Sequence, residues 1–226
     1  MSHYAVAVFS DDGDFDSLLK PYNENDREEF VFAVVPYETI QSEFQKFKKQ
    51  NPSYTLNMYI KLYKYEQNNG QWGYWHNPHG YWDWYSLDGR SYMYDLKDGV
   101  ELSEDEYDYR KNDYDWYPED KENTEEDAEF WDVYISGGKE DGYPSLWSRE
   151  YYLERYKTRE QFLKEMALIV PYAFITPDGV WHAPGEVGPF ATSSETAESF
   201  NKYVKEWEAW IASDENPYVN LVDCHI

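Results

Sequence analysis

Residues Gly73–Tyr94 read GYWHNPHGYWDWYSLDGRSYMY, an aromatic stretch near the middle of a chain of 226 residues. With the preceding tryptophan, it contains nine aromatic side chains: Trp72, Tyr74, Trp75, Tyr81, Trp82, Trp84, Tyr85, Tyr92 and Tyr94. Asn77-Pro78 and His79-Gly80 predict a turn, because proline fixes φ and glycine tolerates conformations that other residues avoid. Asp88-Gly89 predicts a tight hairpin turn, since both central positions of a type I′ turn need positive φ.

The residues between these turns alternate in the manner of a strand. Over Tyr81–Leu87, Trp82 and Trp84 fall on one face, and Tyr85 falls on the other. The residues after the second turn, up to Tyr94, are expected to return as the partner strand. The prediction is therefore an aromatic hairpin with two tryptophans on one face and Arg90 just past its turn.

Apolar patterns predict the remaining elements. Strands are expected over His3–Ser10, Glu29–Pro36, Pro171–Thr176, Val180–Ala183 and Tyr218–Ile226. Helices are expected over Glu38–Gln50, Tyr54–Gln67, Ser148–Ile169 and Ser194–Ala212. Tyr54–Gln67 also fits the alternation of a strand, and Ser148–Ile169 has an N-cap candidate at Ser148 and a second at Thr158. Helices and strands interleave without regular βαβ spacing, which favours an α+β fold. We expect a single mixed or antiparallel sheet containing both terminal strands, with helices packed on it.

We expect one domain over residues 1–226, with an acidic, aromatic-rich insertion over residues 101–147. Glu101–Asp132 holds fifteen carboxylates. It also contains seven aromatic residues, whereas disordered acidic tails normally have few. The insertion is therefore expected to be at least partly ordered, with its aromatic rings packed inward and its carboxylates outward.

The charge of −25 limits the partners that the chain can bind. Such a field repels phosphate backbones, so direct binding of duplex nucleic acid is not expected. It suits a basic protein surface, or imitation of the charge of a nucleic acid. A single cysteine, Cys224, makes an intrachain disulfide impossible. No signal peptide and no membrane span are expected, which favours a cytoplasmic protein.

Three stretches carry a resemblance to a known family. Asn77–Arg90 contains Asn-Pro, then Trp-Asp-Trp-Tyr and Gly-Arg; Pro171–His182 contains TPDGVWH; the chain ends in VDCHI. In this order they resemble a family of bacteriophage proteins of similar size to which no reaction is assigned. The resemblance touches both halves of the chain. It implies a phage origin and therefore action in the host-cell cytoplasm.

The chain departs from the pattern of that family at two places. Asp88 stands where the family commonly has glycine, and Gly188-Pro189-Phe190 stands where it commonly has a Gly-Trp-Phe-like run. The second departure leaves any role of that loop open.

The aromatic hairpin is the first candidate site. Flat rings stack on nucleobases, and a guanidinium binds phosphate through paired donors, which are the needs of a nucleotide pocket. The expected ligand-binding residues are Trp82, Trp84, Tyr85, Arg90, His76, Trp181 and His182. The alternative is a tryptophan-rich core face on which Arg90 pairs with Asp83 or Asp88.

The C-terminal strand is the second candidate site. Asp223 and His225 share a face, because residues two apart on a strand point the same way. With His182 nearby they would form a metal site or an acid–base pair. A structural role for His225 is the favoured interpretation, so we expect no cofactor, no resident metal and no assigned catalytic residue.

Three function classes follow from these observations. The first is a phage counter-defence protein that sequesters a small nucleotide-derived immune signal of the host. The second is an acidic nucleic-acid mimic that inhibits a host defence protein through a basic surface. The third is a metal-dependent or carboxylate-based hydrolase. We favour binding over catalysis and leave homo-oligomerisation open.

Overall fold

The computed structural model describes residues 3–101, 109–116, 125–137, 148–167, 170–188 and 192–226. Their contacts divide the chain into two compact units. Unit 1 comprises Met1–Leu19 with Trp84–Ile226, and unit 2 comprises Lys20–Asp83. The predicted α+β class is confirmed. Two units differ from the single domain expected over residues 1–226, and the acidic region 101–147 falls within unit 1.

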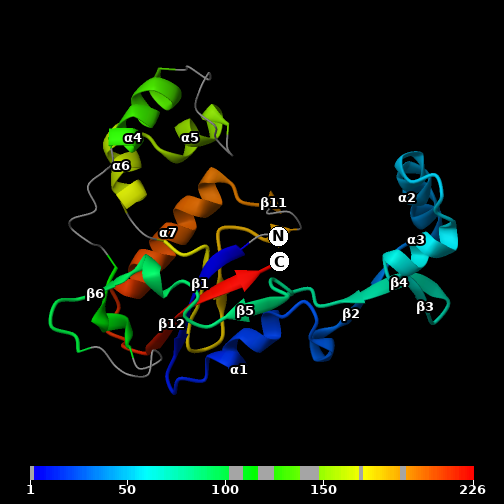
Figure 1. Cartoon of the computed structure of the whole chain (residues 1–226), viewed down its shortest axis with the longest axis horizontal. Coiled ribbons are helices and arrows are strands. Elements are labelled where there is room, and N and C mark those ends of the chain that lie inside the picture. Colours follow the sequence, from blue (N-terminus) through cyan, green and yellow to red (C-terminus); the bar gives the residue numbers. More distant parts are fainter. Residues whose placement is uncertain (1–2, 102–108, 117–124, 138–147, 168–169, 189–191) are drawn as a thin grey trace. The chain divides into compact units, whose positions relative to one another are not determined.

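Unit 1 is built on a five-stranded mixed sheet (Figure 1). The strands are β1 (His3–Ser10), β5 (Trp84–Ser86), β8 (Ala173–Ile175), β9 (Trp181–His182) and β12 (Tyr218–His225). Their order is β5-β12-β1-β8-β9. Only β1 and β8 run parallel, and β8 and β9 form the hairpin predicted around Pro177-Asp178-Gly179.

Both terminal strands belong to this sheet, as predicted, and they are neighbours in it. β1 and β12 pair antiparallel from His3↔His225 to Ser10↔Tyr218. Val6 through Phe9 are fully buried, which explains why both faces of β1 are apolar.

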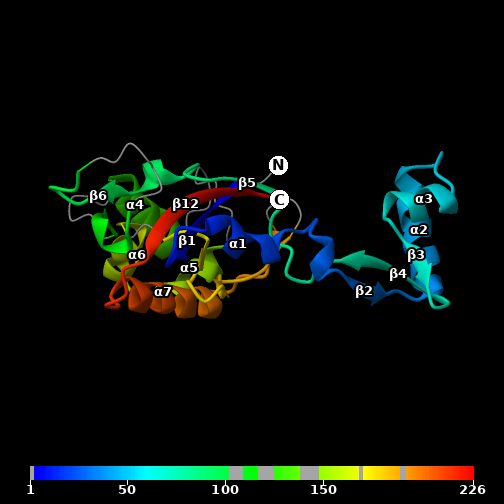
Figure 2. The same ribbon diagram turned by 90° about the horizontal axis from the view of Figure 1, so that it is seen from below.

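Helix α7 (Ala197–Ile211) covers one face of the sheet (Figure 2). It begins with a capping box in which the side chains of Thr196 and Ser199 each accept the other's backbone N–H. Its inner face carries Trp207, which is fully buried and packs with Phe9 of β1 and Phe174 of β8.

The described part of the acidic region contributes to the same core. Strand β6 (Asp95–Leu96) pairs with β7 (Tyr114–Asp115), and the 3-10 turns η3 (Ser91–Met93) and η4 (Lys111–Asp113) precede them. Tyr114 and Trp116 are buried against β1 and α7. For these two rings the expected inward packing is confirmed.

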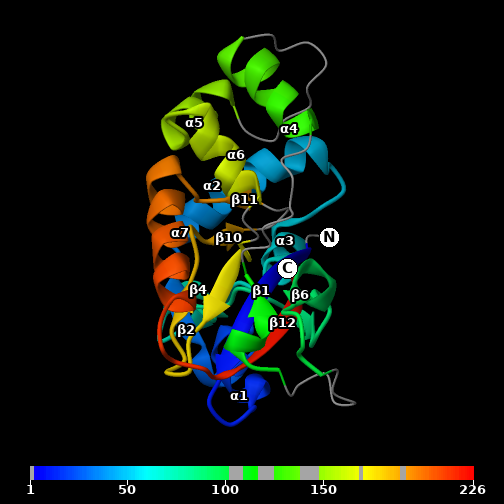
Figure 3. The same ribbon diagram turned by 90° about the vertical axis from the view of Figure 1, so that its left-hand side faces the viewer.

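A second hydrophobic cluster in unit 1 joins four helical segments (Figure 3). They are α4 (Glu125–Glu129), the π-helix η5 (Phe130–Ser136), α5 (Arg149–Arg155) and α6 (Arg159–Ala167). The segment Ser148–Ile169, for which the sequence offers N-caps at Ser148 and at Thr158, forms two helices. The hydroxyl of Ser148 accepts the N–H of Tyr151 in α5, and that of Thr158 accepts the N–H of Gln161 at the start of α6.

Unit 2 has its own small core. Its elements are η1 (Lys20–Tyr22), η2 (Arg27–Glu29), β2 (Val31–Val34), α2 (Tyr37–Gln50), α3 (Leu56–Leu62), β3 (Glu66–Asn68) and β4 (Gln71–His76). The sheet order is β2-β4-β3. Ile40 and Phe44 of α2 pack with Tyr59 of α3. The predicted Asn77–Gly80 turn is present, and the buried Asn77 amide donates to the carbonyls of Pro21 and Asn23.

Three shorter elements complete unit 1: α1 (Phe15–Leu19), β10 (Val187–Gly188) and β11 (Thr192–Ser193). Most of the Gly188–Phe190 loop lies outside the described residues. No helix among the described residues has the length and apolarity to cross a membrane.

The predicted aromatic hairpin is wrong. Trp84–Ser86 does not pair with the residues after Asp88-Gly89, which form the 3-10 turn η3; it pairs with β12. Asp88 has φ +53, but the φ of Gly89 is not positive, so the type I′ turn is not formed; the N–H of Gly89 donates to the carbonyl of Ser86 instead. However, the side chain of Asn220 on β12 accepts the N–H of Asp88 and donates to its carboxylate. The turn is therefore bound to β12, and its following residues leave the sheet.

We predict that Lys111→Met destabilises unit 1. Lys111 is fully buried, and its Nζ donates to the carbonyls of Trp210 and Ser213 and to the Ser213 hydroxyl, at 2.8–2.9 Å. It thereby satisfies groups at the C-terminal end of α7, although desolvation lowers its pKa. The variant should lose about 1–3 kcal/mol in urea unfolding. Lys205→Met, at an exposed position of α7, is the control, and equal stability of the two variants would contradict this role.

We also predict a loss of stability in alkali. Burial is the main cause that raises the pKa of Tyr94 and Tyr203, and burial followed by Glu43 raises that of Tyr65 to about 12. Unfolded tyrosines release their protons near pH 10, so the native state holds more protons above that pH. The contribution of these tyrosines to the free energy of unfolding is complete below about pH 10. It is lost as the pH rises through the pKa values of the tyrosines in the native state. Phenolate absorbance should show two groups of tyrosines, the second appearing only with unfolding; a single transition near pH 10 in a folded protein would refute the prediction.

Candidate functional site

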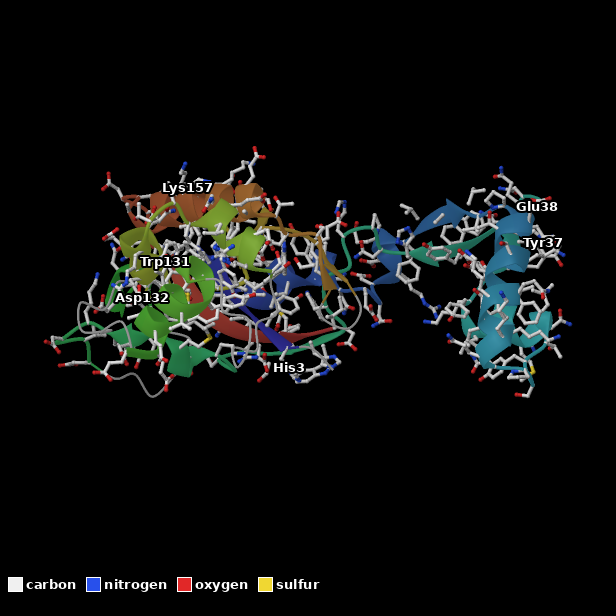
Figure 4. The ribbon with its side chains drawn as sticks, turned by 90° about the horizontal axis from the view of Figure 1, so that it is seen from above. His3, Tyr37, Glu38, Trp131, Asp132 and Lys157 are labelled. Atoms are coloured by element: carbon white, nitrogen blue, oxygen red, sulfur yellow. The ribbon has the colours of Figure 1, made fainter. Side chains whose placement is uncertain are left out.

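Three aromatic rings lie in one row across adjacent strands of the main sheet. His225 of β12 pairs with His3 of β1 on one side and with Trp84 of β5 on the other. Trp84 stacks on His225 with ring centroids 5.5 Å apart and an angle of 17°, and His3 meets Trp84 edge-on at 5.5 Å. Figure 4 labels His3 at this end of the sheet. We call His3, Trp84, Arg90, Asp223 and His225 the Trp84 cluster.

Asp223 connects the row of rings to Arg90. One carboxylate oxygen accepts a hydrogen bond from Nε of Arg90 at 2.9 Å and lies 2.8 Å from the Nη2 atom of the same guanidinium. The other oxygen lies 3.0 Å from Nδ1 of His3. Both Asp223 and Arg90 are mostly buried, so these charge-assisted bonds are weakly screened. The carboxylate therefore holds both the guanidinium of Arg90 and the imidazole of His3, and His3 contacts Trp84.

The Asp88-Gly89 turn brings Arg90 to this position. The N–H of Arg90 donates to the carbonyl of Leu221 at 3.0 Å. A Cβ on Gly89 would lie 2.6 Å from Cβ of Asp223. Only glycine allows the turn to approach the carboxylate so closely.

The side chains of the Trp84 cluster differ in their exposure to solvent. His225 is buried, whereas Trp84 remains 45% exposed and His3 is partly exposed. The indole is therefore supported from below by an imidazole and offers a flat apolar surface to solvent. Such a surface can stack on a planar ring, with a guanidinium and a second imidazole beside it.

Tyr85 lies on the opposite face of the sheet from Trp84. Its hydroxyl donates to Asp16 of α1, and burial together with this carboxylate raises its pKa. Cys224 occupies the same face of β12 and is fully buried, which raises the pKa of its thiol. The prediction that Tyr85 joins Trp84 in one pocket is therefore wrong.

Trp82 and His76 belong to unit 2. Trp82 is buried, and its backbone N–H donates to the carbonyl of Tyr22. His76 ends β4 beside Tyr74. The expectation that Trp82 and Trp84 share one face of a strand is wrong, because β5 begins only at Trp84.

Trp181 and His182 lie on β9, at the far edge of the main sheet. His182 stacks on Phe174 at 4.4 Å, and its Nδ1 lies 3.5 Å from Glu206 of α7. Strand pairing leads from His182 to Phe174 of β8, then to Ala7 of β1 and to Leu221 of β12, so β9 is three strands away from β12. Three strand spacings separate it from β12 by roughly 14 Å. The predicted set of His182, Asp223 and His225 is therefore not brought together.

His182 instead lines an acidic hollow of about 540 Å³. The other lining residues are Asp11, Thr176, Pro177, Asp178, Trp210 and Glu215. Within the part of the chain that the structure describes, no group of three or more His, Cys, Asp or Glu side chains could hold a metal ion.

The chain matches no protein-family model, and comparisons with curated proteins and with solved structures find no match either.

Sequence reasoning missed His3 and the true partner of Arg90. His3 is not among the site residues that the sequence predicts, and the sequence predicts Asp83 or Asp88 as the partner of Arg90 on a core face. Both contacts join residues more than 130 positions apart. The one available signal was the shared face of Asp223 and His225, which correctly placed both residues on one side of β12.

We predict that Asp223→Asn loosens the Trp84 cluster. The amide lacks the charge that holds Arg90 and His3, so unfolding free energy should fall by about 1–3 kcal/mol. The imidazole resonances of His3 should shift in NMR spectra. Asp95→Asn, at an exposed position of β6, serves as the control. If both variants unfold at the same urea concentration, Asp223 does not organise the cluster.

Proposed function

We propose that this protein acts by binding, and that it holds a small, flat, nucleotide-like molecule at the Trp84 cluster. The observation that carries the proposal is the half-exposed indole of Trp84, held on His225 by strand pairing. An exposed tryptophan leaves a large apolar ring in contact with water, and a bound ligand would cover that ring. Here the sheet fixes its ring, which reduces the entropy lost when a ligand stacks on it.

The neighbouring groups suit a ligand that combines an aromatic ring with polar or anionic groups. Arg90 and His3 supply nitrogen donors within the same cluster, and Asp223 supplies an acceptor. Ring stacking provides affinity for any base, and the polar groups provide orientation.

The resemblance to bacteriophage proteins gives this binding activity a biological setting. In a host cell, a protein of this kind would lower the free concentration of a nucleotide-derived immune signal and so act as a counter-defence factor. The ligand would be released unchanged, because the proposal requires no chemical step.

A second candidate function rests on the charge of unit 1. Thirteen basic and thirty-seven acidic residues give this unit a net charge of −24. Such a surface could occupy the basic, nucleic-acid-binding face of a host defence protein. Steep weakening of that complex by salt would distinguish charge mimicry from ligand sequestration.

Mass spectrometry of small molecules provides the direct test. The protein is incubated with lysate from phage-challenged cells, purified again and denatured by heat. Recovery of an intact nucleotide in a stoichiometric amount is the expected result. A cleaved nucleotide would indicate an enzyme instead, and recovery of nothing would favour the acidic surface of unit 1.

Variants of two matched tryptophans test the location of the site. Loss of base stacking costs about 1–3 kcal/mol, so Trp84→Ala should raise the dissociation constant roughly 5- to 150-fold in equilibrium dialysis. Trp84→Ala with Arg90→Ala should abolish sequestration in a folded protein. Trp75→Ala is the control, because Trp75 is 43% exposed but lies in unit 2. Equal binding by the Trp84 and Trp75 variants would refute the site.

A further inference from the structure

The charge of the chain is divided very unequally between its two units. Unit 2 contains seven basic and eight acidic residues and is nearly neutral, whereas unit 1 carries −24. Within unit 2, residues 44–65 contain five lysines and no acidic residue. This basic segment comprises the last two turns of α2, all of α3 and the loop that joins them.

The lysines of the basic segment lie on its surface. They are Lys46, Lys48, Lys49, Lys61 and Lys64, and all five are exposed. Within the described ranges, none of the five makes an ion pair with a carboxylate. The segment therefore presents a charge of +5 on a chain whose net charge is −25.

Exposed apolar side chains lie among these lysines. Tyr59 of α3 points inward and packs on Phe44 and Phe47. On the outer side, Met58 is 46% exposed and Leu62, one turn later, is 52% exposed. Aliphatic side chains contribute to protein interfaces but do not stack on bases. Tyr63 is exposed as well, at 47%, but its ring packs on Tyr59 at 4.5 Å. Lysine beside methionine and leucine thus favours an acidic protein surface over a nucleic acid.

We propose that the basic segment is a docking surface for unit 1 of a second copy of this chain. Unit 1 supplies the required chemistry, a strongly acidic protein surface, at the same concentration as the basic segment. In a two-fold pair the same contact is made twice, which doubles the attraction that must offset the repulsion between two acidic chains. Because the attraction is electrostatic in part, high salt weakens it.

Sedimentation velocity of the full chain over a range of concentrations tests the proposal. The wild type should form a reversible dimer that dissociates in high salt. The charge reversals Lys48→Glu and Lys61→Glu together should leave a monomer. Lys202→Glu with Lys205→Glu changes the charge equally on α7 of unit 1 and should leave the dimer intact. A wild type that stays monomeric, or a dimer that persists in the Lys48/Lys61 variant, would overturn the proposal.

Cross-linking identifies what the surface contacts. A carbodiimide should join lysines of the basic segment to carboxylates of unit 1, between isotope-labelled and unlabelled copies. Links confined to a single copy would show that the segment docks within its own chain, contrary to the proposal. Binding of polyuridylate by a monomeric wild type, lost on Lys48→Glu with Lys61→Glu, would assign the surface to a phosphate polymer and also overturn it.

Discussion

The antiparallel pairing of β1 with β12 is the constraint on which unit 1 depends. It joins the first described residues to the last along eight pairs, from His3↔His225 to Ser10↔Tyr218. Closing so long a loop has a large entropic cost, which the fully buried centre of both strands offsets by removing apolar surface from water. The other strands of the main sheet flank this pair, with β5 next to β12 and with β8 and β9 on the β1 side.

The same pairing creates the candidate site. Strand register places His3 and Trp84 on either side of His225, and the period of two places Asp223 on the same face. Asn220, on the opposite face of β12, binds the Asp88 turn and so delivers Arg90 to Asp223. A single strand therefore supplies the base of the stacked rings, the carboxylate and the anchor for the guanidinium. A shift of one residue in the β12–β5 register would separate Trp84 from His225, and the same shift in the β1–β12 register would separate His3 from both.

The two units have different electrostatic characters, and each suits a different kind of contact. In unit 1, aromatic rings of the acidic region enter the core while the buried Lys111 binds the end of α7. The carboxylates that remain outside give this unit its negative surface. In unit 2, aromatic residues of α2 and α3 form the core, and lysines and aliphatic residues of α3 stay outside. Ligand binding at the Trp84 cluster and docking through the basic segment would thus use separate parts of the chain.

The sequence by itself determined the α+β class, both terminal strands, the β8–β9 hairpin and helices α2 and α7, because each depends on local periodicity and turn chemistry. It also indicated that Asp223 and His225 share a face. Only the tertiary structure decided that Trp84 pairs with His225 and not across the Asp88 turn, and that Trp82 belongs to another unit. Those choices depend on which distant strand offers unsatisfied backbone groups and apolar area, and no local pattern encodes that competition. For the same reason His3, an isolated residue near the chain start, entered the site only through its register with the other end of the chain.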